Sequence, residues 1–333
     1  MSIDFPQGQR GLSLVELMIA LLLSTLLIGG VLQMFLSSKQ TYSTNNALFR
    51  VQENGRFAME FLAYDLRNAG YKGECMGAPN NLLNESSPSY SEELFDLTVS
   101  VMGWENGTRA GITGRVAGTD SILLKHAAVA SGATATGNTG ITANTIGVTG
   151  ASNIPADSIV LVADALGCDV FQTQNNQSGN SLSRGAQGTP GNKNPGSHNF
   201  SHAYGSDMEI LKLHSALYYI GTGGNGLPAL RRVTYNTGAS NDQELVEGIH
   251  DMQITYGTVN ANRQVTGEFV AASSSTDWEN VAAVRIELLA VSADANVVQE
   301  SQQLTFNGAT VTVPDRRLGQ VFTTTFSIRN RLP

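Results

Sequence analysis

Residues 12–36 read LSLVELMIALLLSTLLIGGVLQMFL, an apolar run in which Glu16 is the one charged residue. As an α-helix this run would extend about 37 Å, which is long enough to cross the ~30 Å hydrocarbon layer of a bilayer. An unpaired carboxylate in that layer costs a few kcal/mol, so Glu16 is expected to find a partner or a route to water. The run therefore predicts a membrane-spanning helix with a functional acidic residue near its start.

The segment before this run is polar. Residues 1–11 read MSIDFPQGQRG and are expected to form a leader that neither folds into a stable helix nor packs. An ordinary secretory signal is cut after its apolar run, and the mature chain loses that run. Here the leader ends at Arg10-Gly11, the apolar run follows directly, and Glu16 is the fifth residue after Gly11. This arrangement resembles the type IV prepilins.

The resemblance to type IV prepilins implies a processing route and a role for Glu16. A prepilin peptidase would cut after Gly11, and Leu12 would become the N-methylated first residue. The carboxylate of Glu16 would face the free amine of Leu12 on a neighbouring subunit and set the axial register, because a buried charge without its partner is costly. The alternative is a Glu16 side chain that reaches the membrane interface. The family usually has Phe and Thr where this chain has Leu12 and Ser13.

The helical pattern continues beyond the apolar run. Residues 12–38 are expected to form the membrane half of the helix, later the filament core, and residues 39–69 an amphipathic half beneath a head. Gly29-Gly30 is the point where the helix would be interrupted, and Gly70 is a natural C-terminal stop. Residues at intervals of three and four predict the covered face. They are Leu48, Val51, Gly55, Ala58, Leu62, Leu66 and Ala69, with Phe57 and Phe61 widening the stripe.

Residues 70–333 are expected to form a β-rich head outside the cytoplasm. The predicted fold class is therefore α+β, with the long helix packed against an antiparallel sheet. Residues 131–153 and 172–205 are rich in Gly, Ser, Thr and Asn, so we expect long polar surface loops there that supply no core. Short or alternating apolar runs bounded by turn residues predict the strands. These runs cover residues 121–130, 158–163, 209–220, 230–236, 252–256, 281–291 and 321–328.

The chain has two cysteines, Cys75 and Cys168, and both lie beyond the apolar run. In an oxidising compartment they could pair, and the long loop closed in this way would stabilise the head by roughly 3 to 5 kcal/mol. Two unrelated buried thiols are the alternative. The sequence leaves the pairing open.

Composition and motifs disfavour several functions. A net charge of −8 argues against nucleic acid as a partner, since that binding depends on clustered Lys and Arg. The GxGxxG pattern at 221–226 lies between two predicted strands and predicts a hairpin turn, not a nucleotide site. His198 and His202 stand four apart, with His214 further on, but no acidic or cysteine partner is evident nearby, so we expect solvated loop histidines. We predict no enzymatic activity, cofactor or metal.

Several head segments resemble two related groups of pilin-like proteins, the PilW-type minor pilins and the J-type pseudopilins of type II secretion. The segments are LVEGI at 245–249, MQITYG at 252–257, Trp278 with the run 281–289, and RRLGQVFTTT at 316–325, the last being especially similar to PilW. The resemblance covers residues 8–72 and 207–333 and touches residues 85–205 little. It implies a low-abundance subunit that helps to start a type IV pilus, sits near its tip, and supports twitching motility and adhesion.

The same resemblance implies partners and a location. The partners would be the prepilin peptidase, an inner-membrane assembly platform, the other minor pilins, the major pilin and a tip adhesin. Before assembly the chain would span the inner membrane once, with a cytoplasmic N-terminus, which Arg10 favours, and a periplasmic head. It would then join a pilus on the cell surface. A J-type pseudopilin and a membrane-tethered adhesive module are the alternatives.

Overall fold

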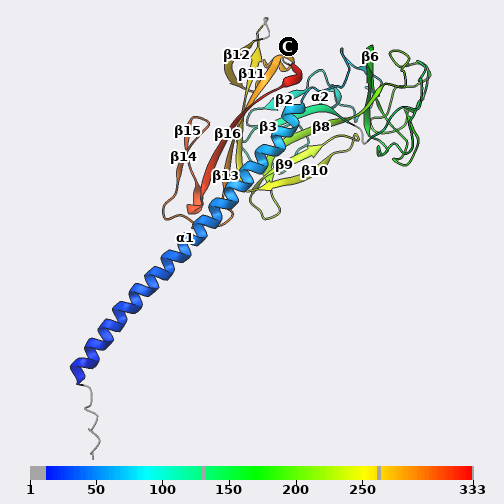
Figure 1. The fold of residues 1–333 in the computed structure, drawn as a ribbon. Coiled ribbons are helices and arrows are strands. Elements are labelled where there is room, and N and C mark those ends of the chain that lie inside the picture. The colour runs from blue at the N-terminus through cyan, green and yellow to red at the C-terminus, as the bar shows by residue number, and fades with distance from the viewer. Residues whose placement is uncertain (1–12, 130–131, 261–263, 332–333) are drawn as a thin grey trace, which may run out of the picture.

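The computed structural model describes residues 13–129, 132–260 and 264–331, in which a long helix extends from a β-rich head (Figure 1). The predicted leader and the predicted cleavage and methylation residues, Gly11 and Leu12, lie outside the described residues. The architecture is α+β with antiparallel sheets packed on the helix, so the predicted fold class is confirmed.

Helix α1 (Leu14–Asn68) is continuous over 55 residues. Ser13 caps its N-terminus, and Gly70 follows its last turn with a φ of +78°, in the left-handed region that favours glycine. The predicted end of the helix is confirmed to within one residue. The helix passes through Gly29-Gly30 without the predicted interruption. Leu and Met residues flank the pair, and their high helix propensity offsets the low propensity of the two glycines.

The larger sheet has eight strands within the described residues. They are β1 (Asn80–Asn81), β2 (Val101–Trp104), β3 (Ser121–Val129), β5 (Ile159–Asp164), β6 (Gly167–Gln172), β8 (Glu209–Thr222), β9 (Pro228–Thr234) and β10 (Asn241–Glu247). Six of them follow the order β1-β6-β5-β8-β3-β2, while β9 pairs with β8 and β10 with β9 off this path, and all pairs are antiparallel except β1 with β6. The long strand β8 pairs with β5 through its first part and with β9 through its second, so it forms the spine of the sheet.

A second sheet has four antiparallel strands in the order β12-β11-β13-β16. Their bounds are β11 (Ile249–Val259), β12 (Val265–Ala271), β13 (Val281–Val291) and β16 (Gly319–Ser327). Two small ribbons complete the strands: β4 (Thr145–Gly147) with β7 (Ser181–Ser183), and β14 (Gln303–Phe306) with β15 (Ala309–Thr312). The short helices are α2 (Glu92–Phe95), η1 (Trp278–Asn280), η2 (Pro314–Arg316) and η3 (Arg329–Arg331).

The second half of α1 packs against both sheets, chiefly on β16, β13, β10 and β3, as the crossing of the helix over the head in Figure 1 shows. The main apolar core joins this half of the helix to both sheets. Val51, Ala58, Leu62 and Leu66 are each exposed by 2% or less, so this part of the predicted covered face is confirmed. The helix is therefore a structural member of the head along half of its length.

Phe57 and Phe61 do not widen the covered face as predicted. Their exposed fractions are 48% and 38%, whereas Ala58 and Leu62, one position later, are fully buried. One position corresponds to a rotation of about 100° around a helix, which carries both rings beyond the edge of the sheets. The prediction was wrong because the sheets cover a narrower stripe than the apolar pattern indicates.

All seven predicted strands are present. The two stretches predicted as surface loops, however, contain short strands and contribute buried residues. The stretch 131–153, described from residue 132 onward, and the stretch 172–205 contain the paired strands β4 and β7. Their few apolar residues bury in a separate core with β5, β6 and β8. The prediction of no core was wrong because Ile146, Val148, Leu182, Phe200 and Tyr204, although far apart in sequence, converge on one sheet.

Cys75 and Cys168 form a disulfide with a Cα–Cα distance of 5.4 Å. Cys75 lies in the turn after α1, and Cys168 lies in β6. Of the two arrangements that the sequence left open, the structure has the paired one. The bond ties the segment that leaves the helix to the far part of the larger sheet.

Candidate functional site

The first half of α1 presents apolar side chains that no other part of the described chain covers. From Leu14 to Leu36 the large apolar side chains are exposed by 52% to 75%. Within the described residues, α1 is the one helix long and apolar enough to cross a membrane. An apolar surface of this size requires lipid or other helices around it. The exposed half of α1 is therefore an association surface.

Glu16 lies in the first turn of this exposed half and is itself exposed. Its carboxylate accepts the backbone N–H of Ser13 at 3.0 Å, and the Ser13 hydroxyl accepts the backbone N–H of Glu16 at 3.2 Å. This capping box holds the carboxylate at the positive end of the helix dipole. Within the described chain, Ser13 is therefore the partner of the Glu16 carboxylate.

Polar contacts fix where α1 joins the head. The side chains of Gln40 and Thr44 both donate to the backbone carbonyl of Val297, at 2.8 and 2.5 Å, and Asn54 donates to the carbonyl of Glu247 at 3.1 Å. These donors begin just beyond the exposed half, so the boundary between the two halves of the helix lies near residue 40.

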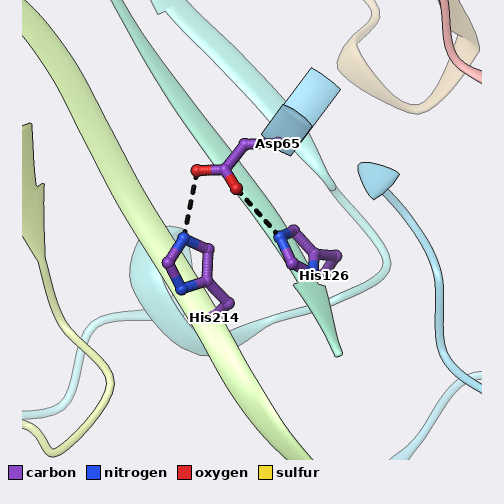
Figure 2. A group of neighbouring side chains, drawn as sticks. All are labelled: Asp65, His126 and His214. Carbon is purple, nitrogen blue, oxygen red and sulfur yellow. Dashed lines mark hydrogen bonds and ion pairs between the residues drawn. The ribbon is translucent and has the colours of Figure 1, made fainter. Parts of the chain in front are cut away.

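A buried polar cluster lies at the other end of α1, where the last turns of the helix meet β3 and β8. Figure 2 shows Asp65 between His126 and His214. The Nε2 atom of His126 lies 3.2 Å from Oδ1 of Asp65, and Nε2 of His214 lies 3.0 Å from Oδ2. The Tyr218 hydroxyl donates to the same Oδ2 at 2.7 Å. The carboxylate thus has contacts to three side chains from the sheet.

The cluster follows from the register of the sheet. His126 and His214 are directly opposite one another on neighbouring antiparallel strands, so both rings project from the same face toward α1. Asp65 is 1% exposed. Burial acts to raise the pKa of Asp65, but hydrogen bonds from His126 and His214 outweigh it and hold that pKa well below its usual value. The side chain is therefore a carboxylate that lies between the two imidazole rings.

Two of the three residues in this cluster were not singled out from the sequence. Asp65 falls on the predicted covered face, three residues after Leu62, and a carboxylate at a covered position is a signal for a buried partner. His126 falls inside a predicted apolar strand, which is the same kind of signal. Local sequence patterns cannot predict the pairing of His126 with His214, because that contact depends on the alignment of β3 with β8.

Two of the three histidines that we expected to be solvated have acidic partners. The expectation that His198, His202 and His214 have no acidic partner was wrong for two of them, because His202 Nε2 lies 2.9 Å from both carboxylate oxygens of Asp164 and His214 contacts Asp65. Their partners come from other elements and are far away in sequence. The GxGxxG pattern at 221–226 forms the β8–β9 hairpin turn, as predicted.

Comparison with known proteins gives two family matches. Residues 6–32 match the prokaryotic N-terminal methylation motif, and residues 217–330 match the family described as type IV pilus-assembly protein W. No curated protein sequence matches the chain. Among solved structures, the chain is similar to the type IV-like pilin TTHA1219 from Thermus thermophilus, at 13% identity and a TM-score of 0.21, over 54% of this chain and 87% of that one.

A methylation motif on a long apolar helix, followed by an antiparallel β-sheet head on its second half, defines a type IV pilin-like protein. Such a motif implies processing by a prepilin peptidase and assembly with other pilins. The match over residues 217–330 identifies the type more narrowly, because it includes β9 to β16 and the last part of β8. Together the motif, the fold and the match over the C-terminal third support a type IV pilin-like protein of the PilW type.

Proposed function

We propose that this chain is a minor pilin that helps to initiate a type IV pilus and sits near its tip, supporting twitching motility and adhesion. The observation that carries the proposal is the exposed apolar half of α1 with Glu16 in its first turn. In the membrane this surface contacts lipid, and in a filament the same surface packs against the helices of other subunits. The folded head remains outside the cytoplasm throughout.

Assembly would replace the local cap of Glu16 with a partner from another subunit. Cleavage after Gly11 frees the amine of Leu12, which is then methylated. The carboxylate of Glu16, now held by the backbone N–H of Ser13, is released to the amine of the neighbouring Leu12. In the apolar core of a filament little water screens this charge pair, so leaving it unmade is costly and the pair sets the axial register of the subunits. The inner-membrane platform, the major pilin, the other minor pilins and a tip adhesin are the proposed partners.

The test is a pair of substitutions in the producing cell. Gly11→Ala should leave the leader attached, which mass spectrometry of the N-terminus detects, and Glu16→Ala should reduce the number of pili severely with the leader removed as usual. Glu53→Ala is the matched control, because Glu53 is an exposed glutamate on the same helix outside the apolar half. Normal piliation in cells that carry only the Glu16→Ala chain would contradict the proposal.

A J-type pseudopilin has the same N-terminal features, so a phenotype has to separate the two roles. Deletion of the gene should abolish twitching motility and leave exoprotein secretion intact if the chain serves a pilus. The reverse pair of phenotypes would assign the chain to a type II secretion system.

An adhesive role for the head is a second candidate, and one groove favours it. The two tryptophans of the chain, Trp104 and Trp278, line the same groove of about 420 Å³, together with Ser273 and Ser274. Tryptophan is enriched at binding hot spots, and hydroxyl groups add hydrogen-bonding partners.

Since no other tryptophan exists in the chain, tryptophan fluorescence reports on this groove alone. Soluble glycans that change the emission of the full chain, but not of Trp278→Ala, would support adhesion; an unresponsive wild-type chain would oppose it.

A further inference from the structure

The cluster at the end of α1 has the donor atoms of a metal site. We infer that Asp65, His126 and His214 bind a divalent transition-metal ion, with Zn²⁺ as the best match. One ligand atom from each of the three residues lies within 4.8 Å of the others, and Asp65 and His126 are buried between α1, β3 and β8 while His214 is half-buried. The inference concerns the interior of the head and does not depend on the proposed role in assembly.

The hydrogen bonding of His126 is the first reason. Its Nδ1 atom lies 3.2 Å from the backbone carbonyl of Ala127, which can only accept, so Nδ1 carries a hydrogen. With its hydrogen on Nδ1, the ring can present the lone pair of Nε2 to Oδ1 of Asp65, an oxygen that is also an acceptor. Two acceptors 3.2 Å apart need a cation between them, either a proton on Nε2 or a metal ion. A backbone carbonyl on the far nitrogen is the usual support of a metal-binding histidine.

The surroundings of Asp65 and His214 supply the second reason. The Tyr218 hydroxyl donates to Oδ2 of Asp65 and fixes the orientation of the carboxylate, as the outer contacts of a metal site do. His214 contacts the same oxygen through Nε2, and its Nδ1 atom lies 3.5 Å from the amide nitrogen of Asn236, at the limit of a hydrogen bond. Metal binding at Nε2 would move the ring hydrogen of His214 from Nε2 to Nδ1 and would displace the weak contact with the Asn236 amide, which can only donate, so His214 is the adjustable ligand.

The donor set selects the class of ion. Two imidazoles and one carboxylate suit zinc and other first-row transition metals, whereas calcium and magnesium take oxygen ligands. A zinc ion at about 2.0 to 2.2 Å from each donor would complete its tetrahedron with a water molecule. It would join the last turns of α1 to β3 and β8, so the ion would lock the helix onto the larger sheet.

The test uses the full chain, purified in detergent without a histidine tag and freed of metal by a chelator. Titration with Zn²⁺ and with Co²⁺, followed by calorimetry and by the visible absorption of bound Co²⁺, should show one equivalent bound. His214→Gln should weaken the binding roughly 100-fold or more, since it removes a direct ligand and even outer contacts are worth about 10- to 100-fold. His198→Gln, an exposed histidine outside the cluster, should bind as the wild type does.

Two outcomes would overturn the inference. The first is a wild-type chain that takes up no stoichiometric Zn²⁺ or Co²⁺, which would leave the cluster as a hydrogen-bonded ion pair alone. The second is a His214→Gln chain that binds as tightly as the wild type. Circular dichroism shows whether the variant is folded. If it is not, Asp65→Asn, which keeps the shape of the side chain and removes the charged ligand, serves in its place with the same expected loss.

Discussion

Gly55 lies where α1 crosses β16, and a residue of that strand occupies the space that a side chain at position 55 would need. A Cβ atom built at Gly55 would lie 2.1 Å from Cε2 of Phe322, well inside contact distance. Alanine is favoured over glycine in a helix by about 1 kcal/mol, but overpacking costs typically 1 to 3 kcal/mol, so the steric cost should prevail. We predict that Gly55→Ala lowers the free energy of unfolding by about 1 kcal/mol, measured by denaturant titration.

The control for Gly55 is in the same helix. Gly30 has no atom within 4 Å of its would-be Cβ, so Gly30→Ala should leave the stability of the head unchanged. A second substitution, Phe322→Leu, should restore part of the loss caused by Gly55→Ala, because it removes the ring that the new methyl group meets. Equal stabilities for Gly55→Ala and Gly30→Ala would show that the ring moves aside at no cost.

Asp120 carries a pH dependence in the head. It is 2% exposed and accepts the backbone N–H groups of Asn106 and Ile254 at 2.7 and 2.8 Å. Burial raises its pKa to about 6, against the smaller opposite effect of these hydrogen bonds. The folded chain therefore holds the Asp120 proton more tightly than the unfolded chain, so ionisation of Asp120 lowers the free energy of unfolding as pH rises from about 4 to about 6.

Asp120→Asn should remove this pH dependence. His250 acts in the opposite direction, because burial lowers its pKa to about 4 and the folded chain loses stability as pH falls through the range between about 6.5 and 4. In the Asp120→Asn chain the effect of His250 is no longer offset. The free energy of unfolding, measured at pH 4.5 and pH 7, should rise more with pH in this variant than in the wild type. Identical pH slopes would contradict the assignment.

At the scale of elements, the disulfide between Cys75 and Cys168 connects the end of α1 with β6. The long loop that it closes should be worth roughly 3 to 5 kcal/mol, chiefly through the unfolded chain. We predict that the double variant Cys75→Ser, Cys168→Ser loses this amount in chemical denaturation. Adding a thiol reductant should lower the stability of the wild type to a similar value and leave the double variant unchanged, and a reductant effect on both would point to another cause.

The elements differ in how far local patterns predict them. The helix and the seven predicted strands carry strong periodicity or long apolar runs, and β13 (Val281–Val291) has the predicted bounds. Strand β10 was missed because it reads NDQELVE and lies at an edge, where its pairing with β9 needs few apolar side chains. The core beneath residues 172–205 was missed for another reason, since Leu182 and Phe200 bury through contacts distant in sequence.

At the scale of the molecule, the two candidate sites differ in the same way. The motif around Glu16 is local, so adjacent residues predict it. The metal-binding inference needs Asp65, His126 and His214 together, and a helix and two strands must be placed before those residues meet. A linear pattern can reveal each member as a polar residue on an apolar face, but the distances between them arise only from the tertiary fold.

The division of α1 also predicts how the whole molecule can be separated. The main core includes helix residues from Ala47 onward, and the first polar anchors to the head are Gln40 and Thr44, so residues 13–38 add no contact that the head needs. A chain that begins at Lys39 should therefore fold with the thermal midpoint of the full chain, within a few degrees, and remain soluble without detergent. In cells that lack the full chain it should fail to restore pili, because the association surface is missing. A midpoint lowered by ten degrees or more would mean that the apolar half also stabilises the head, and the separation of an assembling half from a folded half would be lost.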